Sequence, residues 1–301
     1  MSRFEIPAAP VVPPHQRGQG TVRLRFEDLS QDGRFLLPSI PTALAEACWA
    51  SVFKTPWTRE ALNQGLVPIL AHAVLWGDPG PFAVNADHSA DGCWALGHTV
   101  DAAGAVNRLL MNMWVDLHGP RGLTYGDPPP GAGERLRAGR MYAEHVLTRP
   151  FAEAEERKVL RIDVPGLEAV PSLRFPWTTP ESLTAIPAEA EPLDADWFIE
   201  PAPYVFGLVH TDVNQHVNSL VYPKVFEAAA LRRVHAHGLS AAILSRRAEM
   251  SFRKPTFGGE VLRIGVRVYR QGDTLGAVGI FFDDASGPKK PRTCIAMEFE
   301  P

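Results

Sequence analysis

The sequence predicts an α+β protein made of two similar halves, each with one long helix and one antiparallel sheet. Three observations support this. Most apolar stretches have the period-two alternation or the Val, Ile and Leu content of strands. Two segments, at 39–53 and 223–238, have the composition of long helices. Sliding the chain by 182 residues places Pro41 on Pro223, and the first helical turn is where a helix tolerates proline.

Composition narrows the class of protein. The chain has 301 residues, 45% of them apolar, which is enough to bury a substantial core. A net charge of -4 gives no overall basic field, so nucleic acid is not an expected partner. No apolar run approaches the roughly 18–20 residues of a membrane span, and the proline-broken N-terminus lacks the core of a signal peptide. Three scattered cysteines without a CxxC predict neither a disulfide framework nor a zinc site, and favour a reducing, cytoplasmic setting.

The first half is expected to begin with a strand at 21–26, where TVRLRF alternates, followed by a helix of about 12 residues from Pro41. The segment 140–147 is compatible with either a strand or a helix. Runs of Val, Ile, Leu and Trp between Gly, Pro and Asp predict the remaining strands, at 66–76, 93–100, 106–117, 140–147 and 158–164.

The second half is expected to repeat this order. A strand at 204–210 and a polar turn at 212–219 precede the helix at 223–238. Strands are then predicted at 246–255, 260–273, 275–284 and 292–300. The predicted organisation is a Pro-rich disordered tail (1–20), an N-terminal domain (21–165), a linker (166–195) and a C-terminal domain (196–301).

A carboxylate, several carboxamides and an imidazole lie close together in DVNQHVN, residues 212–218, directly before the second predicted helix. Free amides and the dipole at a helix N-terminus favour developing negative charge, such as the oxyanion of an attacked thioester. Asp212 is expected to attack or to activate water, Asn214 to orient, and His216 to transfer a proton. The amides of Val217 to Leu220 are expected to polarise the carbonyl. The same residue types also fit a plain Asx turn that caps the helix.

The segment DVNQHVNSLVY (212–222) resembles the D-x-N-Q-H-V-N-N-x-x-Y segment of the plant and bacterial acyl-acyl carrier protein thioesterases, and more loosely the hotdog acyl-CoA thioesterases. MSFRKPTFGGEVLRI (250–264) resembles the strand that follows their second helix. The resemblance implies a tandem, or double, hotdog fold with Asp212, Asn214 and His216 as catalytic groups. It also implies that the N-terminal half chiefly shapes the acyl pocket, and the absence of the triad from the first half at the 182-residue offset predicts that its own site is degenerate.

From this resemblance we expect an acyl-CoA or acyl carrier protein substrate, a place in fatty acid metabolism, and no cofactor or metal. The two halves would form an intramolecular pseudo-dimer, with further pairing into a homodimer left open. Five of the seven tryptophans lie in the first half, where they would line a tunnel for an acyl tail or simply pack. The residues expected to contact the substrate are Val217, Asn218, Tyr222 and Arg253.

Three departures from the family pattern bear on the mechanism. The family often has a further Asp two residues before the first catalytic one, where this chain has His210, and the second Asn of H-V-N-N is Ser219. The place of the family's catalytic Glu is taken by Pro255, so that Glu249 or Glu260 would have to substitute, or Asp212 and His216 would act alone. In the first half, Ser30, Asp32 and Arg34 align with the three catalytic positions, although Asp28 and Asp32 would still be available across the interface.

Two other functions remain open from the sequence. One is an enoyl-thioester hydratase or hydroxyacyl dehydratase, although the Pro and the longer Asn-to-His spacing of that segment are missing here. The other is a non-catalytic acyl-binding protein in which the turn is a relic.

Overall fold

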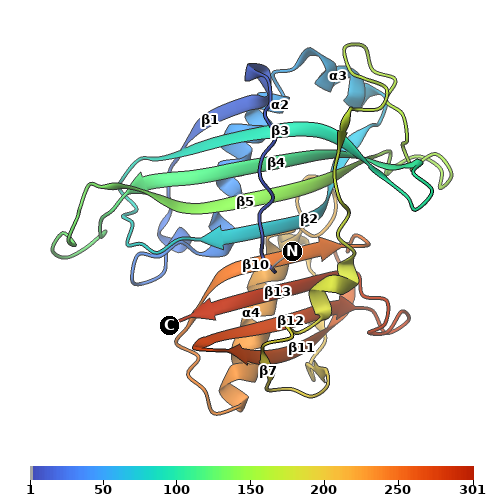
Figure 1. Cartoon of the computed structure of the whole chain (residues 1–301). Helices are drawn as coiled ribbons and strands as arrows, with labels where there is room; N and C mark the ends of the chain where they lie inside the picture. The colour runs from blue at the N-terminus through green and yellow to red at the C-terminus, as the bar shows by residue number, and fades with distance from the viewer. Residues whose placement is uncertain (1–2) are drawn as a thin grey trace.

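One large antiparallel sheet forms the backbone of the molecule in the computed structural model, which describes residues 3–301. Its strand order is β1-β3-β4-β5-β2-β10-β13-β12-β11-β7, with short strands attached at the two edges. The sequence-distant strands β2 and β10 pair at the centre, so the two halves share one sheet (Figure 1). The long strands are β1 (Arg17–Val22), β2 (Val67–Gly77), β3 (His88–Val100), β4 (Val106–Pro120), β5 (Arg135–Thr148), β10 (Leu244–Phe252), β11 (Val261–Gln271), β12 (Thr274–Phe282) and β13 (Thr293–Glu300).

Each half of the sheet carries its own long helix on the same face, behind the strands in Figure 1. The first is continuous from Pro41 to Val52, with a π-helical turn (Ala45–Trp49) between α1 (Pro41–Leu44) and α2 (Ala50–Val52). The second is α4 (Val221–Ala236). A shorter helix, α3 (Pro56–Asn63), follows the first. The predicted plan of two halves, each with a helix against an antiparallel sheet, is therefore observed.

Both predicted helix starts are close to the observed ones. Pro41 is the first residue of α1, where its missing N–H costs no helical hydrogen bond. Pro223 is the third residue of α4, still inside the turn whose amides have no partner within the helix. The two prolines therefore mark the same part of each half.

The opposite face of the sheet is covered by two segments that lack long elements (Figure 1). Within the tail expected to be disordered, the described residues from 3 onwards lie across the sheet. Phe4 and Val12 are buried against this face. The Trp76 and Trp114 indoles donate hydrogen bonds to the backbone carbonyls of Phe4 and Pro7. Residues 17–22 form the edge strand β1, so the predicted strand at 21–26 starts too late.

The predicted linker is also packed rather than free. Its β6 (Leu173–Arg174) pairs with β3, a 3-10 helix spans Pro180–Thr184, and β7 (Glu191–Pro192) pairs with β11. Two predicted strands did not form. Residues 158–164 are irregular, and 204–210 contain only β9 (Tyr204–Val205) and a 3-10 helix (Leu208–His210).

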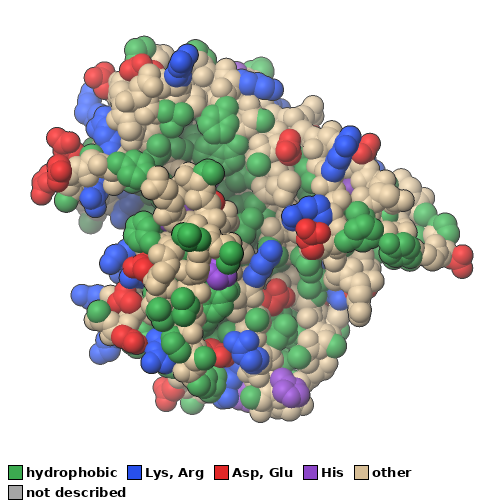
Figure 2. All heavy atoms as spheres, turned by 180° about the vertical axis from the view of Figure 1, so that it is seen from behind, with side chains coloured by type: hydrophobic (Ala, Val, Ile, Leu, Met, Phe, Trp, Pro, Cys, Tyr) green, Lys and Arg blue, Asp and Glu red, His purple; other side chains and the backbone are tan. Residues whose placement is uncertain are grey.

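The core lies between the sheet and the two helices. Its apolar side chains come from alternate positions of the central strands, such as Ala73 and Leu75 of β2 and Ala248 and Met250 of β10. Figure 2, which shows the helix face, has hydrophobic side chains in a recess of the upper half. Within residues 3–301, no helix is long and apolar enough to cross a membrane.

Candidate active site

The turn before α4 has a tightly defined backbone. Thr211 and Val217 form an isolated antiparallel bridge, which closes the turn at its base. Inside it, the Asp212 amide donates to the His216 carbonyl at 3.2 Å, and the Gln215 amide donates to the Asp212 carbonyl at 3.0 Å. Gln215 has a φ of 64°, in the left-handed region that side chains other than glycine rarely adopt. The bridge and these hydrogen bonds define the backbone of the turn.

The Asp212 carboxylate is oriented by two hydrogen bonds from its own turn. Oδ1 accepts the Asn214 backbone N–H at 2.8 Å, and Oδ2 accepts the Asn218 side-chain amide at 3.0 Å. The first bond is that of an Asx turn, one of the structures that the sequence allowed. Asp212 and His216 are half-buried, whereas Asn214 is exposed. His216 Nδ1 is buried without a hydrogen-bond partner in the part of the chain that the structure describes.

The backbone amides expected to polarise the substrate carbonyl are mostly occupied, which corrects that expectation. Val217 donates its N–H to the Thr256 carbonyl at 2.8 Å, and Asn218 donates to the His210 carbonyl at 2.9 Å. The Leu220 amide donates to Asn218 Oδ1 at 2.8 Å. Of the Val217 to Leu220 amides, only that of Ser219 lacks an acceptor within residues 3–301.

The residues predicted to contact substrate lie in different environments. Val217 and Tyr222 are 4% and 2% exposed, and Tyr222 packs edge-on against Phe252 and Phe281. Burial raises the pKa of the Tyr222 phenol. Both side chains pack beneath the turn, and their contact with substrate stays a prediction. Arg253 lies at the surface, where it forms an ion pair with Glu181 of the 3-10 helix at Pro180–Thr184.

The structure separates the two acids that were candidates for the family's catalytic Glu. Glu249 points to the sheet face away from the helices, where it pairs with His72 at 2.9 Å and accepts the Phe4 amide. Glu260 follows the loop that contacts the turn through Thr256, and pairs with Arg292 at 2.6 Å. Burial alone would raise the Glu260 pKa, but hydrogen bonds, chiefly from Arg292, lower it overall. Only Glu260 is on the side of the turn.

Apolar residues around the turn were missed by the sequence analysis as a possible contact surface. Leu208, Val209 and Val213 are 82%, 90% and 94% exposed, and Phe257 on the neighbouring loop is 48% exposed. We call these four residues the apolar rim. Residues 204–210 were expected to form a strand, but only Tyr204–Val205 does, and the segment continues into a 3-10 helix at Leu208–His210. The available signal was Gly207, which interrupts the apolar run.

Asp28 and Asp32, the two acids of the first half, interact with residues of their own segment. Asp28 is buried, pairs with Arg25 and accepts a hydrogen bond from the Ser39 hydroxyl. Asp32 pairs with Arg34. Although burial would raise both pKa values, these hydrogen bonds and charges lower them overall. The structure gives neither acid a contact with the second turn.

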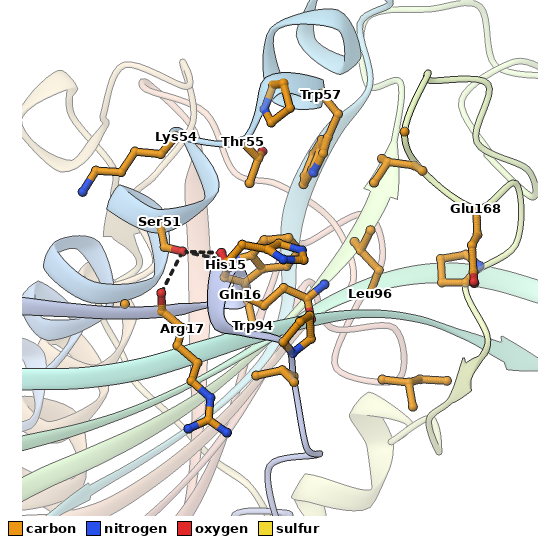
Figure 3. Close-up of a pocket in the computed structure, with 18 of the residues that line it drawn as sticks. His15, Gln16, Arg17, Ser51, Lys54, Thr55, Trp57, Trp94, Leu96 and Glu168 are labelled. Carbon is orange, nitrogen blue, oxygen red and sulfur yellow. Dashed lines mark hydrogen bonds between the residues drawn. The ribbon is translucent and has the colours of Figure 1, made fainter.

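Two cavities lie in the N-terminal half, and neither is lined by residues of the 212–218 turn. The larger (Figure 3) is lined by Trp57 and Trp94 and the smaller by Trp114, so three of the five N-terminal tryptophans line a cavity. Within residues 3–301, no cluster of three or more His, Cys, Asp or Glu side chains could hold a metal ion.

Comparisons with known proteins agree on the fold. Residues 214–289 match the thioesterase superfamily model, and this match begins inside the turn. No curated protein matches the sequence. Among solved structures, the chain is similar to a protein of Lactobacillus plantarum named as an oleoyl thioesterase, with a TM-score of 0.56 and 11% identity over 94% of this chain and 96% of that one.

Two further structures have the same extent of similarity. An acyl-ACP thioesterase from Bacteroides thetaiotaomicron has a TM-score of 0.55 and 11% identity, over 95% of this chain and 98% of that one. The 12:0-ACP thioesterase from Umbellularia californica has a TM-score of 0.55 and 14% identity over the same shares of the two chains. The resemblance to the hotdog-fold thioesterases is thereby confirmed, in the C-terminal segment by the family match and along the whole chain by the fold.

Proposed function

We propose that this protein hydrolyses acyl thioesters at the turn before α4, and that its two halves are two hotdog units of which only the second is catalytic. The observation that carries the proposal is the thioesterase superfamily match over residues 214–289, which includes Asn214 and His216 of the turn. Full-length similarity to three proteins named as thioesterases supports it. Two of those names specify acyl-ACP, so an acyl carrier protein or acyl-CoA is the proposed substrate.

Asp212 is the proposed group that starts the reaction. Its carboxylate, held by the Asn214 amide and the Asn218 side chain, either takes a proton from water that attacks the carbonyl carbon or attacks that carbon directly. When water attacks, the carbon–sulfur bond breaks and the proton taken by Asp212 passes through His216 to the departing thiolate. When Asp212 attacks directly, His216 donates the proton to the thiolate; water then hydrolyses the resulting anhydride, one proton of that water returns to His216, and the free acid leaves. Asn214 lies at the exposed side of the turn, where it would orient the water or the carbonyl.

The Ser219 amide is the proposed oxyanion donor. It is the member of the Val217 to Leu220 group that has no acceptor among the described residues, and it lies two residues before the first residue of α4. A backbone N–H at a helix N-terminus is a fixed donor that needs no reorganisation when charge develops on the carbonyl oxygen.

The apolar rim is the proposed contact for the thiol-bearing arm of the substrate. Its side chains surround the turn and are unusually exposed for their size. Binding of a long, partly apolar arm would cover this surface and remove water from the turn, which strengthens the electrostatic interactions there.

The test is thiol release from a panel of acyl-CoAs and acyl carrier proteins. We expect Asp212→Asn to lower the turnover by about 10²- to 10⁴-fold, the range for a positioned acid or base. Asp32→Asn, in the turn of the first half, is the matched control and should keep full activity. Unchanged release by Asp212→Asn would contradict the proposal. Hydration of a crotonyl thioester without thiol release would favour the hydratase, and saturable binding without any turnover would favour the non-catalytic protein.

A further inference from the structure

One edge of the second half of the sheet has a buried arginine at its centre. β10 and β12 end at this edge, at Phe252 and Phe282, and β11 and β13 begin there, at Val261 and Thr293. Arg292 directly precedes β13, which lies between β10 and β12 (Figure 1). Its side chain is only 9% exposed, so the charge depends on partners within the protein.

The Arg292 guanidinium binds acceptors from three different segments. Nε donates to Asp283 Oδ2 at 2.8 Å, and Nη1 donates to Glu260 Oε2 at 2.6 Å. Nη1 also donates to the Pro255 carbonyl at 3.3 Å. The hydrogen bond to Glu260 is the main reason that the pKa of Arg292 is raised, although burial would lower it. The rigid fork of donors on a guanidinium suits it to join several acceptors in one geometry.

The loop after β10, residues 253–257, is also tied to Arg292 at both of its ends. At the start, the Arg253 amide donates to the Arg292 carbonyl at 2.8 Å. At the end, the Phe257 amide donates at 2.7 Å to the same Glu260 oxygen that Arg292 binds. The position of this loop therefore depends on one side chain.

This loop supports the turn before α4. The Thr256 carbonyl accepts the Val217 amide at 2.8 Å, and Val217 directly follows His216. The His216 carbonyl in turn accepts the Asp212 amide at 3.2 Å. A displacement of the loop would therefore shift the backbone that carries the proposed proton-transfer groups, and a shift of about 1 Å can cost about 10²-fold in rate.

Glu260 is better placed to neutralise Arg292 than to transfer a proton. In the part of the chain that the structure describes, no hydrogen bond or ion pair joins Glu260 to Asp212 or His216. Burial alone would raise the pKa of Glu260, but hydrogen bonds, chiefly from Arg292, lower it overall. A carboxylate with a lowered pKa is a weaker base, and it has no proton to donate at neutral pH.

We propose that Arg292 is a positioning residue for the reaction at the turn before α4. It fixes loop 253–257 and, through Thr256, the backbone next to His216. Glu260 is the counter-ion of Arg292 and takes no part in proton transfer. The inference rests on the proposed thioester hydrolysis at this turn.

Amide hydrogen exchange tests the positioning without any substrate. In Arg292→Lys the Val217 amide should exchange about tenfold faster or more, because lysine lacks the fork that binds three acceptors. Arg263→Gln is the matched control and should leave this exchange unchanged. Arg263 likewise donates to an aspartate, Asp284, at 3.2 Å and to a proline carbonyl, Pro201, at 3.3 Å, and neither partner has a hydrogen bond to the turn within residues 3–301.

Steady-state thiol release tests the consequence for the reaction. Arg292→Lys should lower kcat by about 10- to 100-fold, because the reacting groups are displaced. KM should change by less than about threefold, since only Phe257 of the apolar rim lies on the loop. Glu260→Gln should lower kcat by less than about threefold and leave the pH profile unchanged, because the Gln carbonyl still accepts both hydrogen bonds. Arg263→Gln should keep the wild-type kinetics.

The proposal is overturned if the Val217 amide exchanges as slowly in Arg292→Lys as in the control. It is also overturned if Glu260→Gln loses more activity than Arg292→Lys, or abolishes a limb of the pH profile, because Glu260 would then be the catalytic acid or base. If Arg292→Lys does not fold, the triple variant Arg292→Met/Glu260→Gln/Asp283→Asn gives the same expectations and leaves no buried charge without a partner.

The two proposals fail in different ways. If Asp212→Asn lowers thiol release and Arg292→Lys does not, the positioning role alone is wrong. If Asp212→Asn leaves thiol release unchanged, hydrolysis at the turn is wrong, and the exchange of the Val217 amide still decides whether Arg292 holds the turn.

Discussion

The turns that precede the two long helices have the same backbone but different side chains. The bridge between Leu29 and Phe35 in the first half corresponds, at an offset of 182 residues, to the bridge between Thr211 and Val217 in the second. Each turn is preceded by a 3-10 helix, at Phe26–Asp28 and Leu208–His210. The repeat suggested by the two prolines is therefore preserved residue by residue in these turns.

The hydrogen bonds inside the two turns follow the same offset. Ser30 donates its N–H to the Arg34 carbonyl at 2.8 Å, and Asp212 donates to the His216 carbonyl at 3.2 Å. The two turns differ in the ion pairs that their side chains form. In the first turn the charges neutralise one another, whereas in the second the His216 ring has no charged partner among the described residues. Because both turns share one backbone, the turn geometry alone is not evidence of catalysis.

The largest effect is expected when the second turn is given the side chains of the first. Asp212→Ser with His216→Arg should reduce thiol release by about 10²- to 10⁴-fold, because both proposed proton-transfer groups are removed. The free energy of unfolding should change by less than about 1 kcal/mol, since Ser30 and Arg34 occupy the same backbone positions. Steady-state kinetics and urea unfolding measure the two quantities. The reverse pair in the first turn, Ser30→Asp with Arg34→His, should leave thiol release unchanged.

A second change isolates the proposed oxyanion donor. Val221 donates its N–H to the Asn218 carbonyl at 3.0 Å, and the φ and ψ of Leu220 are -74° and -13°. These values place Ser219 at the second position of a type I turn, where proline is favoured. Ser219→Pro should therefore keep the turn but remove the N–H, and lower kcat by about 10²- to 10³-fold. Ser219→Ala keeps the N–H and should retain activity. Equal activity of the two variants would argue against this donor.

A buried histidine distinguishes the core of the first half from that of the second. His145 on β5 packs edge-on against Trp49 of the π-helical turn, and burial lowers its pKa to about 4. β13, the corresponding strand of the second half, places Ile295 and Met297 in its core.

Since an unfolded histidine has a pKa of about 6.5, only the unfolded chain binds this proton between about pH 6.5 and 4. The contribution of His145 to stability is complete above about pH 6.5 and is lost as the pH falls towards 4, by about 3 kcal/mol in all. Denaturant unfolding at several pH values should show this slope reduced in His145→Asn. The exposed His235→Asn should keep it.

The smallest effect concerns the residue with positive φ in each turn. Gly33 has a φ of 79° and Gln215, at the same offset, has a φ of 64°. Gln215→Gly should stabilise the protein by about 0.5–1 kcal/mol, because strain at a left-handed residue is relieved and partly offset by the entropy of the unfolded glycine.

Gly33→Ala should destabilise by about 1–3 kcal/mol, since a Cβ there would lie 2.9 Å from the Pro81 Cβ as well as adopt the strained φ. Thermal or urea unfolding measures both changes. Opposite signs are expected, and equal signs would contradict this account of the two turns.

Local pattern in the sequence determined much of the fold. The period of β2, β4, β10, β11, β12 and β13, and the prolines at the two helix starts, were sufficient because strand alternation and helix entry depend on neighbouring residues. The position of the candidate site was also determined locally, since the 212–218 turn combines its polar groups within one short segment.

Only the tertiary structure decided which groups are free to act. Glu249 lies away from the turn because of the face of β10 that it occupies, and Glu260 lies on the side of the turn because of the path of the loop before β11. The acceptor of the Val217 amide comes from Thr256, 39 residues away in the sequence. The position of the N-terminal segment likewise involves distant partners, since the Trp76 and Trp114 indoles donate to the carbonyls of Phe4 and Pro7. These partners are distant in the chain. A segment that is polar, irregular or rich in proline has no periodic pattern of apolar residues, so its contacts cannot be predicted from its sequence.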